Sequence, residues 1–243
     1  IGTGITILML TDSAAVRHVM EGREGFLAAM TPGSLIIDMG STGIEDTYRW
    51  SALCKGKDAA WLDAPVSGGQ AGAIDRSLTI MAGGERDSFA RAEPVLRLLG
   101  TTITHMGRSG TGQATKLANQ IIVANTIAAV AEAFSLAQAA GADLAAVRHS
   151  LLGGFAASRV LDIHGLRMIE GNFAPGGRAT GQLKDILEAT KLAQRHGLVL
   201  PILQTNLTLW QRMIDGGMGG LDHSALIKLY EKKTTGTTTE ENP

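Results

Sequence analysis

The sequence predicts an α/β domain with a largely parallel sheet, followed by an all-helical domain. Short apolar runs without polar alternation recur through the first 105 residues, as expected for strands buried on both faces of a sheet. From residue 113 onward, long helical patterns separated by Gly or Pro take their place. Strands that alternate with helices favour a parallel sheet, and a series of helices without strands favours a helical domain.

Four strands are predicted in the first domain, which we expect to span residues 1–105. Thr11-Asp12-Ser13 offers a helix cap after the first apolar run, and residues 14–20 continue as a helix. Thr31-Pro32-Gly33 is a turn before the second run. The predicted strands are 5–10, 34–39, 60–64 and 77–82.

The second domain is predicted over residues 106–231 and begins with one long inter-domain helix. Residues 113–140 are rich in Ala and Ile and contain neither Pro nor Gly, and Gly141 follows as a helix-terminating residue. Residues 232–243 are rich in Thr and Glu, and we expect them to be disordered. The other predicted helices are 143–152, 158–170, 182–196, 201–215 and 222–232.

The composition is that of an ordinary globular protein. The 243 residues are 44% apolar and 19% charged, with a formal net charge of −1, so no basic excess favours a nucleic-acid partner. Aromatic residues make up only 4%, which is too few for platforms that stack single strands. Cys54 is the only cysteine, so no internal disulfide can form and a reducing cytoplasm is favoured. No signal peptide is visible, and no uninterrupted apolar run of about 18 residues predicts a membrane span.

One motif, Asp63-Ala64-Pro65-Val66-Ser67-Gly68-Gly69, follows the third predicted strand. Two glycines after a serine let the backbone approach a ligand closely and expose N–H groups toward an anion. Such a turn suits a carboxylate. On spacing alone, an ordinary Gly-rich turn between a strand and a loop is the alternative.

A second motif, GTGQATKLANQ at residues 110–120, places one lysine near the start of the long helix. Lys116 and Asn119 are i, i+3 neighbours, so they lie close to one face of that helix. In a dry cleft the pKa of a lysine can fall enough for it to donate a proton near neutral pH. A solvated surface lysine is the alternative.

Three further patterns fail their own spacing tests. Gly2-Thr3-Gly4 follows no strand, and Ile7 stands where a dinucleotide-binding fingerprint needs its third glycine. Asp222-His223-Ser224 has the residue types of a hydrolase triad, but adjacent side chains cannot point at one another, so Asp222 is better interpreted as a helix N-cap. The six histidines show no metal-binding spacing, and no metal site is predicted.

Taken together, these motifs resemble the β-hydroxyacid dehydrogenase family. The resemblance extends from residue 5 to about residue 231, and the order and spacing of its stretches make it specific. KLANQ and GGFAASRVLDIHGLRM are most similar to the branch of the family that reduces tartronate semialdehyde. The other stretches that carry the resemblance are ITILML, LIIDMGST, DAPVSGGQAGAIDRSLTIMAGG, FAPGGRATGQLKD and LDHSAL.

The resemblance implies a Rossmann-type first domain and hydride transfer between NAD or NADP and a short β-hydroxy acid or semialdehyde. Lys116 would be the general acid that protonates the carbonyl oxygen as hydride arrives. The long helix packs against a partner subunit in related enzymes, which implies a homodimer or homotetramer. The residues that would bind substrate are Ser67, Gly68, Gly69, Asn119 and Gln120, and those that would line the cofactor cleft are Leu10, Thr11, Ser41 and Lys184.

The chain also departs from the family pattern. The family begins with a strand and a Gly-rich loop that seats the pyrophosphate, and roughly sixty residues of that unit are not in this sequence, so we expect an incomplete Rossmann-type domain without its phosphate site. Thr11 stands where a proline is usual, Gly177 where a phenylalanine is common, and Gln182 where a histidine is common. We expect the last two to loosen the wall beside the nicotinamide.

The leading functional prediction is therefore an NAD(P)-dependent cytoplasmic oxidoreductase that interconverts tartronate semialdehyde and glycerate. A 3-hydroxyisobutyrate or 2-(hydroxymethyl)glutarate dehydrogenase is an alternative with the same site chemistry and a different pocket. A catalytically inactive truncated fragment that acts only as an oligomerising scaffold is an alternative from another class. The sequence leaves open the choice between NAD and NADP.

Overall fold

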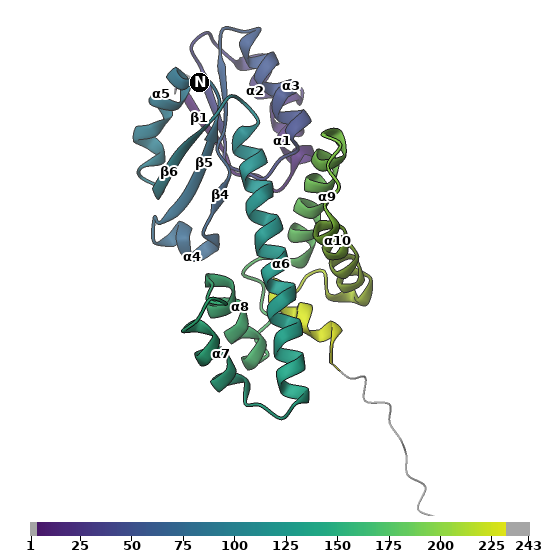
Figure 1. Cartoon of the computed structure of the whole chain (residues 1–243). Helices are drawn as coiled ribbons and strands as arrows, with labels where there is room; N and C mark the ends of the chain where they lie inside the picture. Colours follow the sequence, from purple (N-terminus) through teal and green to yellow (C-terminus); the bar gives the residue numbers. More distant parts are fainter. Residues whose placement is uncertain (1–3, 232–243) are drawn as a thin grey trace, which may run out of the picture. The chain divides into compact units, whose positions relative to one another are not determined.

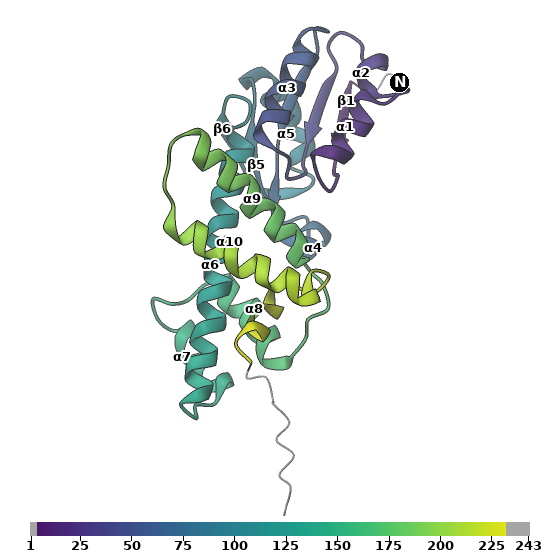
Figure 2. The same ribbon diagram turned by 90° about the vertical axis from the view of Figure 1, so that its right-hand side faces the viewer.

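The computed structural model describes residues 4–231, which form parts of two compact units (Figures 1 and 2). The first unit combines the chain up to Ile122 with Gly181–Leu207, and the second combines Val123–Thr180 with the chain from Thr208 onward. These units group residues that contact one another in space, and the first unit contains residues from both sides of position 105. The predicted domain boundary at residue 105 stays a prediction. The predicted disordered segment, 232–243, lies outside the described residues.

The first unit is built on a six-stranded sheet with the order β1-β2-β3-β5-β4, and β6 also pairs with β5. The pairs β1–β2, β2–β3 and β5–β6 are parallel, whereas β5 runs antiparallel to β3 and β4. The parallel-dominated sheet confirms the predicted α/β class. The strands are β1 (Ile5–Leu8), β2 (Leu35–Asp38), β3 (Ala60–Asp63), β4 (Val66–Ser67), β5 (Leu78–Gly83) and β6 (Gly100–Gly107).

Two strands were not predicted. β4 is only two residues long, and β6 is partly exposed along most of its length, so neither has the buried apolar run of β2, β3 and β5. β1 has an apolar run but is only partly buried, with Ile7 41% exposed, so the expected burial on both faces is wrong for this strand. The antiparallel placement of β5 also has no signature in the apolar pattern, because a strand buried on both faces looks alike in either direction.

Helices cover both faces of this sheet (Figure 1). On one face, α1 and α3 pack against a cluster that includes Trp50 and Trp61, whose ring centroids lie 5.2 Å apart. On the other face, Leu96 of α5 packs on the inner side chains of β2, β3 and β5. Asp12 caps α1 as predicted, because its side chain accepts from the Ala15 N–H at 2.9 Å. The helices of this half are α1 (Ser13–Glu21), α2 (Phe26–Ala29), α3 (Ile44–Lys55), α4 (Gly69–Ile74) and α5 (Arg86–Leu96).

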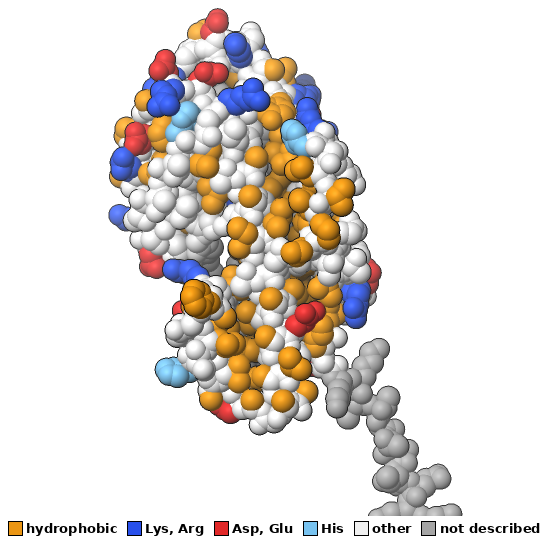
Figure 3. Space-filling model, viewed as in Figure 1, with side chains coloured by type: hydrophobic (Ala, Val, Ile, Leu, Met, Phe, Trp, Pro, Cys, Tyr) orange, Lys and Arg blue, Asp and Glu red, His pale blue; other side chains and the backbone are white. Residues whose placement is uncertain are grey.

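The long helix predicted at 113–140 is α6 (Thr111–Ala139), whose apolar residues are spread around the helix and not gathered on one face. By length and composition this helix could cross a membrane, although polar residues interrupt its apolar sequence. Core helices of globular proteins share this property. Only 39% of its most apolar stretch is buried. Figure 3 shows hydrophobic side chains gathered over it, and its exposed members include Ile122 and Leu136.

The remaining predicted helices are also present in the structure. Asp143 and Ser158 cap α7 and α8 through their side chains, and Gly171 ends α8 with a positive φ of 64°. The last predicted helix is a short 3-10 helix with Asp222 as its N-cap, as predicted for that residue. The elements are α7 (Leu144–Leu152), α8 (Arg159–Glu170), α9 (Ala179–Arg195), α10 (Pro201–Met213), the π-helical turn η1 (Ile214–Met218) and the 3-10 helix η2 (His223–Leu229).

Asp222 is the polar centre of the second unit. Its fully buried carboxylate pairs with Arg167 at 3.1 Å and lies 3.4 Å from His164 Nδ1. It also accepts four hydrogen bonds, from the N–H groups of Gly176, Gly177 and Ser224 and from the Ser224 hydroxyl. Burial raises the pKa of Asp222, but His164, Ser224 and Gly177 together outweigh burial and hold the pKa far below its usual range.

Candidate active site

The four residues assigned to the cofactor lie together at the carboxyl edge of the sheet. Leu10 and Thr11 follow β1, and Ser41 follows β2. Lys184 of α9 donates to the Ser41 carbonyl at 2.6 Å and to the Thr11 carbonyl at 3.2 Å. Ligands of open α/β sheets bind in the crevice outside the carboxyl ends of the strands, so Lys184 marks that edge.

These residues fit a nicotinamide dinucleotide. The Lys184 side chain remains 31% exposed and carries a positive charge beside two strand ends, which suits the phosphates of such a cofactor. Gly40 allows the two ends to meet, because a Cβ there would lie 2.7 Å from the Leu10 carbonyl oxygen. Thr11, Ser41 and Lys184 are the residues that would hold the cofactor at this edge.

Lys116 is buried, with an exposure of 9%, in the second turn of α6. The alternative of a solvated surface lysine is therefore wrong. Burial lowers the pKa of Lys116, the neighbouring Asp185 carboxylate raises it, and Lys184 lowers it, with a net decrease. A lysine with a lowered pKa exchanges a proton more readily near neutral pH.

Gln120 joins α6 to α9 beside this lysine. Its amide nitrogen donates to Asp185 at 2.7 Å and to the Gln182 side chain at 3.2 Å, and Asn119 donates to its oxygen at 2.9 Å. Gln182 also donates to the Gln120 carbonyl at 3.2 Å and is fully buried. Gln182 thus ties the two helices together, and its effect on the wall beside the nicotinamide stays a prediction. Both amide hydrogens of Gln120 are donated to side chains of α9. Its partly buried neighbour Asn119 is therefore better placed than Gln120 to donate a hydrogen bond to a substrate.

Asp185 is a residue that the sequence analysis did not single out. One carboxylate oxygen accepts from Gln120, and the other lies 3.3 Å from Lys184 Nζ, where the described residues give it no well-oriented hydrogen bond. This buried negative charge therefore acts on both lysines of the site. Its only sequence signal was its position beside Lys184, which does not reveal a helix–helix contact.

The Ser67–Gly69 turn connects β4 to α4 in the first unit. Gly68 and Gly69 have φ values of 136° and 62°, so the backbone itself requires glycine at both positions. Ser67 is half-buried and both glycines are exposed. Exposed backbone at this turn is compatible with carboxylate binding, and that role stays a prediction.

Two other places bear on the site predictions. Gly177 lies against the imidazole ring of His223, because a Cβ there would lie 2.8 Å from His223 Cε1, so a larger side chain would displace that ring. No group of three or more potential metal ligands occurs within residues 4–231, and the absence of a metal stays a prediction.

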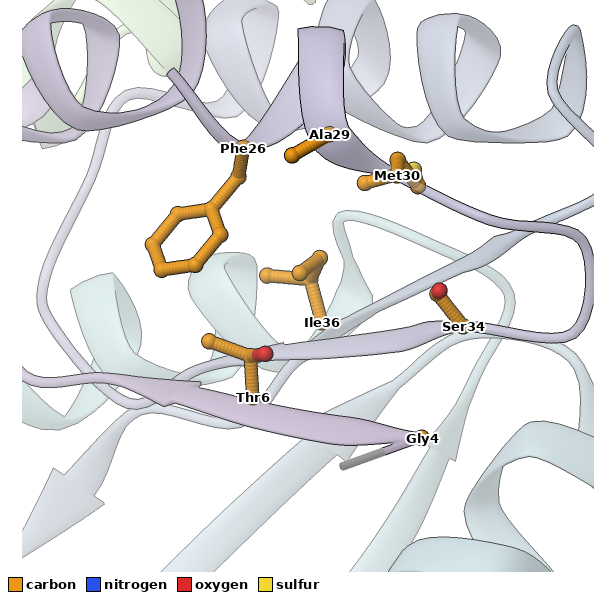
Figure 4. Close-up of a pocket in the computed structure, with 7 residues that line it drawn as sticks. All are labelled: Gly4, Thr6, Phe26, Ala29, Met30, Ser34 and Ile36. Atoms are coloured by element: carbon orange, nitrogen blue, oxygen red, sulfur yellow. The ribbon is translucent and has the colours of Figure 1, made fainter. Parts of the chain in front are cut away.

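A shallow pocket lies at the opposite edge of the sheet, near the amino ends of β1 and β2 (Figure 4). Its lining carries two hydroxyl groups and no charged side chain. None of the residues predicted for the active site contributes to it. Its lining residues are Gly4, Thr6, Phe26, Ala29, Met30, Ser34 and Ile36.

Comparison with known proteins identifies both halves of the chain. Residues 2–107 match the family described as the NAD binding domain of 6-phosphogluconate dehydrogenase. Residues 110–230 match the family described as NAD-binding of NADP-dependent 3-hydroxyisobutyrate dehydrogenase. These matches confirm the prediction of NAD or NADP as the cofactor.

Whole-chain relatives agree with these matches. The chain is 42% identical over 227 residues to 2-hydroxy-3-oxopropionate reductase of Escherichia coli, covering 93% of this chain and 78% of that protein. It is 30% identical to 2-(hydroxymethyl)glutarate dehydrogenase of Eubacterium barkeri, covering 95% and 77%. A crystal structure of 3-hydroxyisobutyrate dehydrogenase from Salmonella typhimurium superposes with a TM-score of 0.87 at 27% identity, covering 94% of this chain and 80% of that one. The chain therefore belongs to the 3-hydroxyisobutyrate dehydrogenase-like family of β-hydroxyacid dehydrogenases.

Proposed function

We propose that this protein reduces tartronate semialdehyde to glycerate with NADH or NADPH, and catalyses the reverse reaction. The observation that carries the proposal is Lys116, a buried lysine whose neighbour Asp185 is itself buried and held by Gln120. The relative at 42% identity is named for this substrate, 2-hydroxy-3-oxopropionate being tartronate semialdehyde.

Lys116 moves the proton of the reaction. When bound, the reduced nicotinamide supplies a hydride to the carbonyl carbon. The Lys116 ammonium then gives its proton to the carbonyl oxygen, so that an alcohol and a neutral amine result. In the reverse direction the neutral amine takes the hydroxyl proton. Burial favours the neutral amine and Asp185 favours the ammonium, and the net effect is a lowered pKa of Lys116.

The rest of the site orients the substrate. Asn119 lies one turn beyond Lys116, where its amide can contact the substrate hydroxyl or carbonyl, and Gln120 holds Asn119 from behind. Ser67, Gly68 and Gly69 would bind the substrate carboxylate through a hydroxyl and backbone N–H groups. Leu10, Thr11, Ser41 and Lys184 would hold the cofactor at the strand ends.

A second candidate substrate is a longer or branched β-hydroxy acid. The relative from Eubacterium barkeri is named for 2-(hydroxymethyl)glutarate, and the matched crystal structure for 3-hydroxyisobutyrate. The same proton donor serves all three reactions, so only the shape of the pocket separates them.

The proposed protein is a cytoplasmic homodimer or homotetramer that binds neither nucleic acid nor a membrane. The apolar surface of α6 supports an assembly, since Ile122 is 66% and Leu136 is 74% exposed. The near-neutral charge supports the absence of a nucleic-acid partner, and the single cysteine supports a reducing cytoplasm. Sedimentation of the purified protein measures the assembly directly.

The test compares kcat/KM for the three acids and semialdehydes with each cofactor. We expect the highest value for tartronate semialdehyde. Lys116→Ala should lower kcat about 10²- to 10⁴-fold, the range typical of a lost general acid. Lys191→Ala, which alters an exposed lysine of α9, is the matched control and should retain full activity. Wild-type turnover by Lys116→Ala would refute the assigned role, and no turnover of any substrate with either cofactor would favour the scaffold alternative.

A further inference from the structure

The first turn of α6 is bound to the end of β3 by a buried carboxylate. Asp63 is the last residue of β3 and is fully buried. One of its oxygens accepts from the Gly110 N–H at 2.8 Å, and the other accepts from the Gln113 N–H at 3.0 Å. Asp63 thus satisfies two of the N–H groups that a helix start leaves without an intrahelical partner.

The same turn is bound to the loop after β2 by the side chain of Gln113. This side chain is also fully buried. Its nitrogen donates to the Gly40 carbonyl at 2.8 Å and to the Thr42 hydroxyl at 3.0 Å, and its oxygen accepts from the Thr42 N–H at 3.3 Å. The Thr42 hydroxyl in turn donates to Asp38 at 2.7 Å, so the contact continues into β2.

The backbone of the first turn of α6 is packed closely against the backbone of β3 and β5. A Cβ at Gly112 would lie 2.4 Å from the Met81 carbonyl oxygen and 2.5 Å from that of Asp63. A Cβ at Gly83 would lie 2.6 Å from the Gly112 nitrogen. The start of α6 therefore rests directly on the ends of β3 and β5, and a side chain at either glycine would force it away.

Two parts of the proposed active site are attached to this anchor. Lys116 is on the same helix, three residues after Gln113 and so about one turn away. Ser41, whose carbonyl accepts from Lys184 at 2.6 Å, lies between Gly40 and Thr42, the two residues that Gln113 holds.

We propose that Asp63 and Gln113 are positioning residues that hold the proton donor Lys116 in a fixed place relative to the cofactor-side loop 40–42. That this positioning serves catalysis rests on the proposed function. That the two residues fix the position of Lys116 does not depend on it. Neither residue needs to touch substrate. The alternative is an ordinary helix cap that stabilises the fold and does not influence the lysine.

The experiment measures the environment of Lys116 without substrate or cofactor. The purified full-length protein is labelled with trace acetic anhydride across a pH series, and mass spectrometry follows the acetylation of Lys116 against that of the exposed Lys191. Gln113→Ala removes the three side-chain contacts of the anchor. Thr42→Val, which keeps the shape and removes one hydroxyl, is a milder second variant in case Gln113→Ala does not fold. Leu96→Ala opens the core under α5 and serves as a control that destabilises the unit elsewhere.

If the proposal holds, the apparent pKa of Lys116 rises in Gln113→Ala and rises less in Thr42→Val, and it stays at its wild-type value in Leu96→Ala. Turnover of tartronate semialdehyde should fall about 10- to 100-fold in kcat in Gln113→Ala, the loss expected from a misplaced catalytic group. Wild-type labelling profiles in both anchor variants would overturn the proposal. If the labelling profile shifts in Gln113→Ala but the wild-type protein shows no reductase activity, the anchor stands and the proposed function is rejected. The two failures are therefore distinguishable.

Discussion

Asp63 and Asp38 in the first unit and Asp222 in the second are buried in different ways. In the first unit, Asp63 is bound by backbone N–H groups and Asp38 by one N–H and a hydroxyl, and neither forms an ion pair within residues 4–231. Burial raises the pKa of Asp63 to about 7 and that of Asp38 to about 6. In the second unit, Asp222 has an arginine partner and more hydrogen bonds, and its pKa is lowered instead.

The difference shows that depth of burial does not decide the charge of a carboxylate. All three side chains are fully buried. His164, Ser224 and Gly177 together outweigh the loss of water around Asp222, whereas the N–H donors of Gly110 and Gln113 do not do so for Asp63. Asp63 and Asp38 are also register neighbours on β3 and β2, and the negative charge of Asp38 further raises the pKa of Asp63.

The largest expected effect is that of removing the cation-paired carboxylate. Asp222→Ala leaves Arg167 without its partner and frees the N–H groups of the 176–177 segment, so we expect a loss of about 3–5 kcal/mol in the free energy of unfolding. Urea unfolding followed by the fluorescence of Trp210, which lies in the second unit, measures it. Asp162→Ala is the control, since Asp162 is 55% exposed in its pair with Arg148 and should cost less than about 1 kcal/mol. Equal losses in the two variants would contradict the comparison.

A smaller effect, with a characteristic pH dependence, is expected for Asp63→Asn. The variant keeps the shape and loses one acceptor, which should cost about 1–3 kcal/mol near pH 5. A carboxyl group whose pKa is raised in the folded state stabilises the fold at low pH, and this contribution disappears as the pH rises from about 4 to about 7. The asparagine does not titrate, so the deficit of the variant should shrink between pH 5 and pH 8.

Asp222→Asn is the counterpart with the opposite sign. A carboxylate with a lowered pKa stabilises the fold above the pKa of the unfolded chain, and that contribution is lost as the pH falls below about 4. The deficit of Asp222→Asn should therefore be full at pH 7 and shrink under acid conditions. Unfolding curves at several pH values, monitored through Trp50 and Trp61 for the first unit and Trp210 for the second, test both signs. If the stability deficit of Asp63→Asn grows with pH, the N–H donors lower the pKa of Asp63 by more than burial raises it.

The smallest effect is expected for a surface ion pair. Arg97 and Glu93 form an i, i+4 pair on α5, with side chains 65% and 34% exposed. Arg97→Ala should change the free energy of unfolding by less than about 0.5 kcal/mol, because solvent and salt screen such pairs. A loss above about 1 kcal/mol in the same urea assay would mean that the exposure of an ion pair does not predict its contribution to the free energy of unfolding.

Local patterns made much of the fold predictable. Strands β2, β3 and β5 were visible because burial on both faces leaves continuous apolar runs, and α6 was visible because a long segment lacks Pro and Gly. The edge strand β6 was missed because its alternating, half-exposed residues are not such a run. The direction of β5 was missed because it depends on pairing between strands and not on composition.

The candidate site was less predictable than the fold. The motif around Lys116 indicated a proton donor, and the resemblance supplied the cofactor residues. The contacts that bury and hold this lysine join residues far apart in the chain: Gln113 lies 50 residues after Asp63, and Asp185 lies 65 after Gln120. No local pattern encodes such pairs, so Asp63, Gln113 and Asp185 became evident only in three dimensions.

The contact between Gly177 and His223 limits the order in which this protein can change. A Cβ at position 177 would lie 2.8 Å from the imidazole ring of His223, so an aromatic residue there requires either a movement of that ring or a smaller residue at position 223. The two positions form an epistatic pair: Gly177→Phe alone should be harmful, whereas His223→Ala followed by Gly177→Phe should be tolerated. Routes toward an aromatic residue at 177 therefore favour a change at position 223 first.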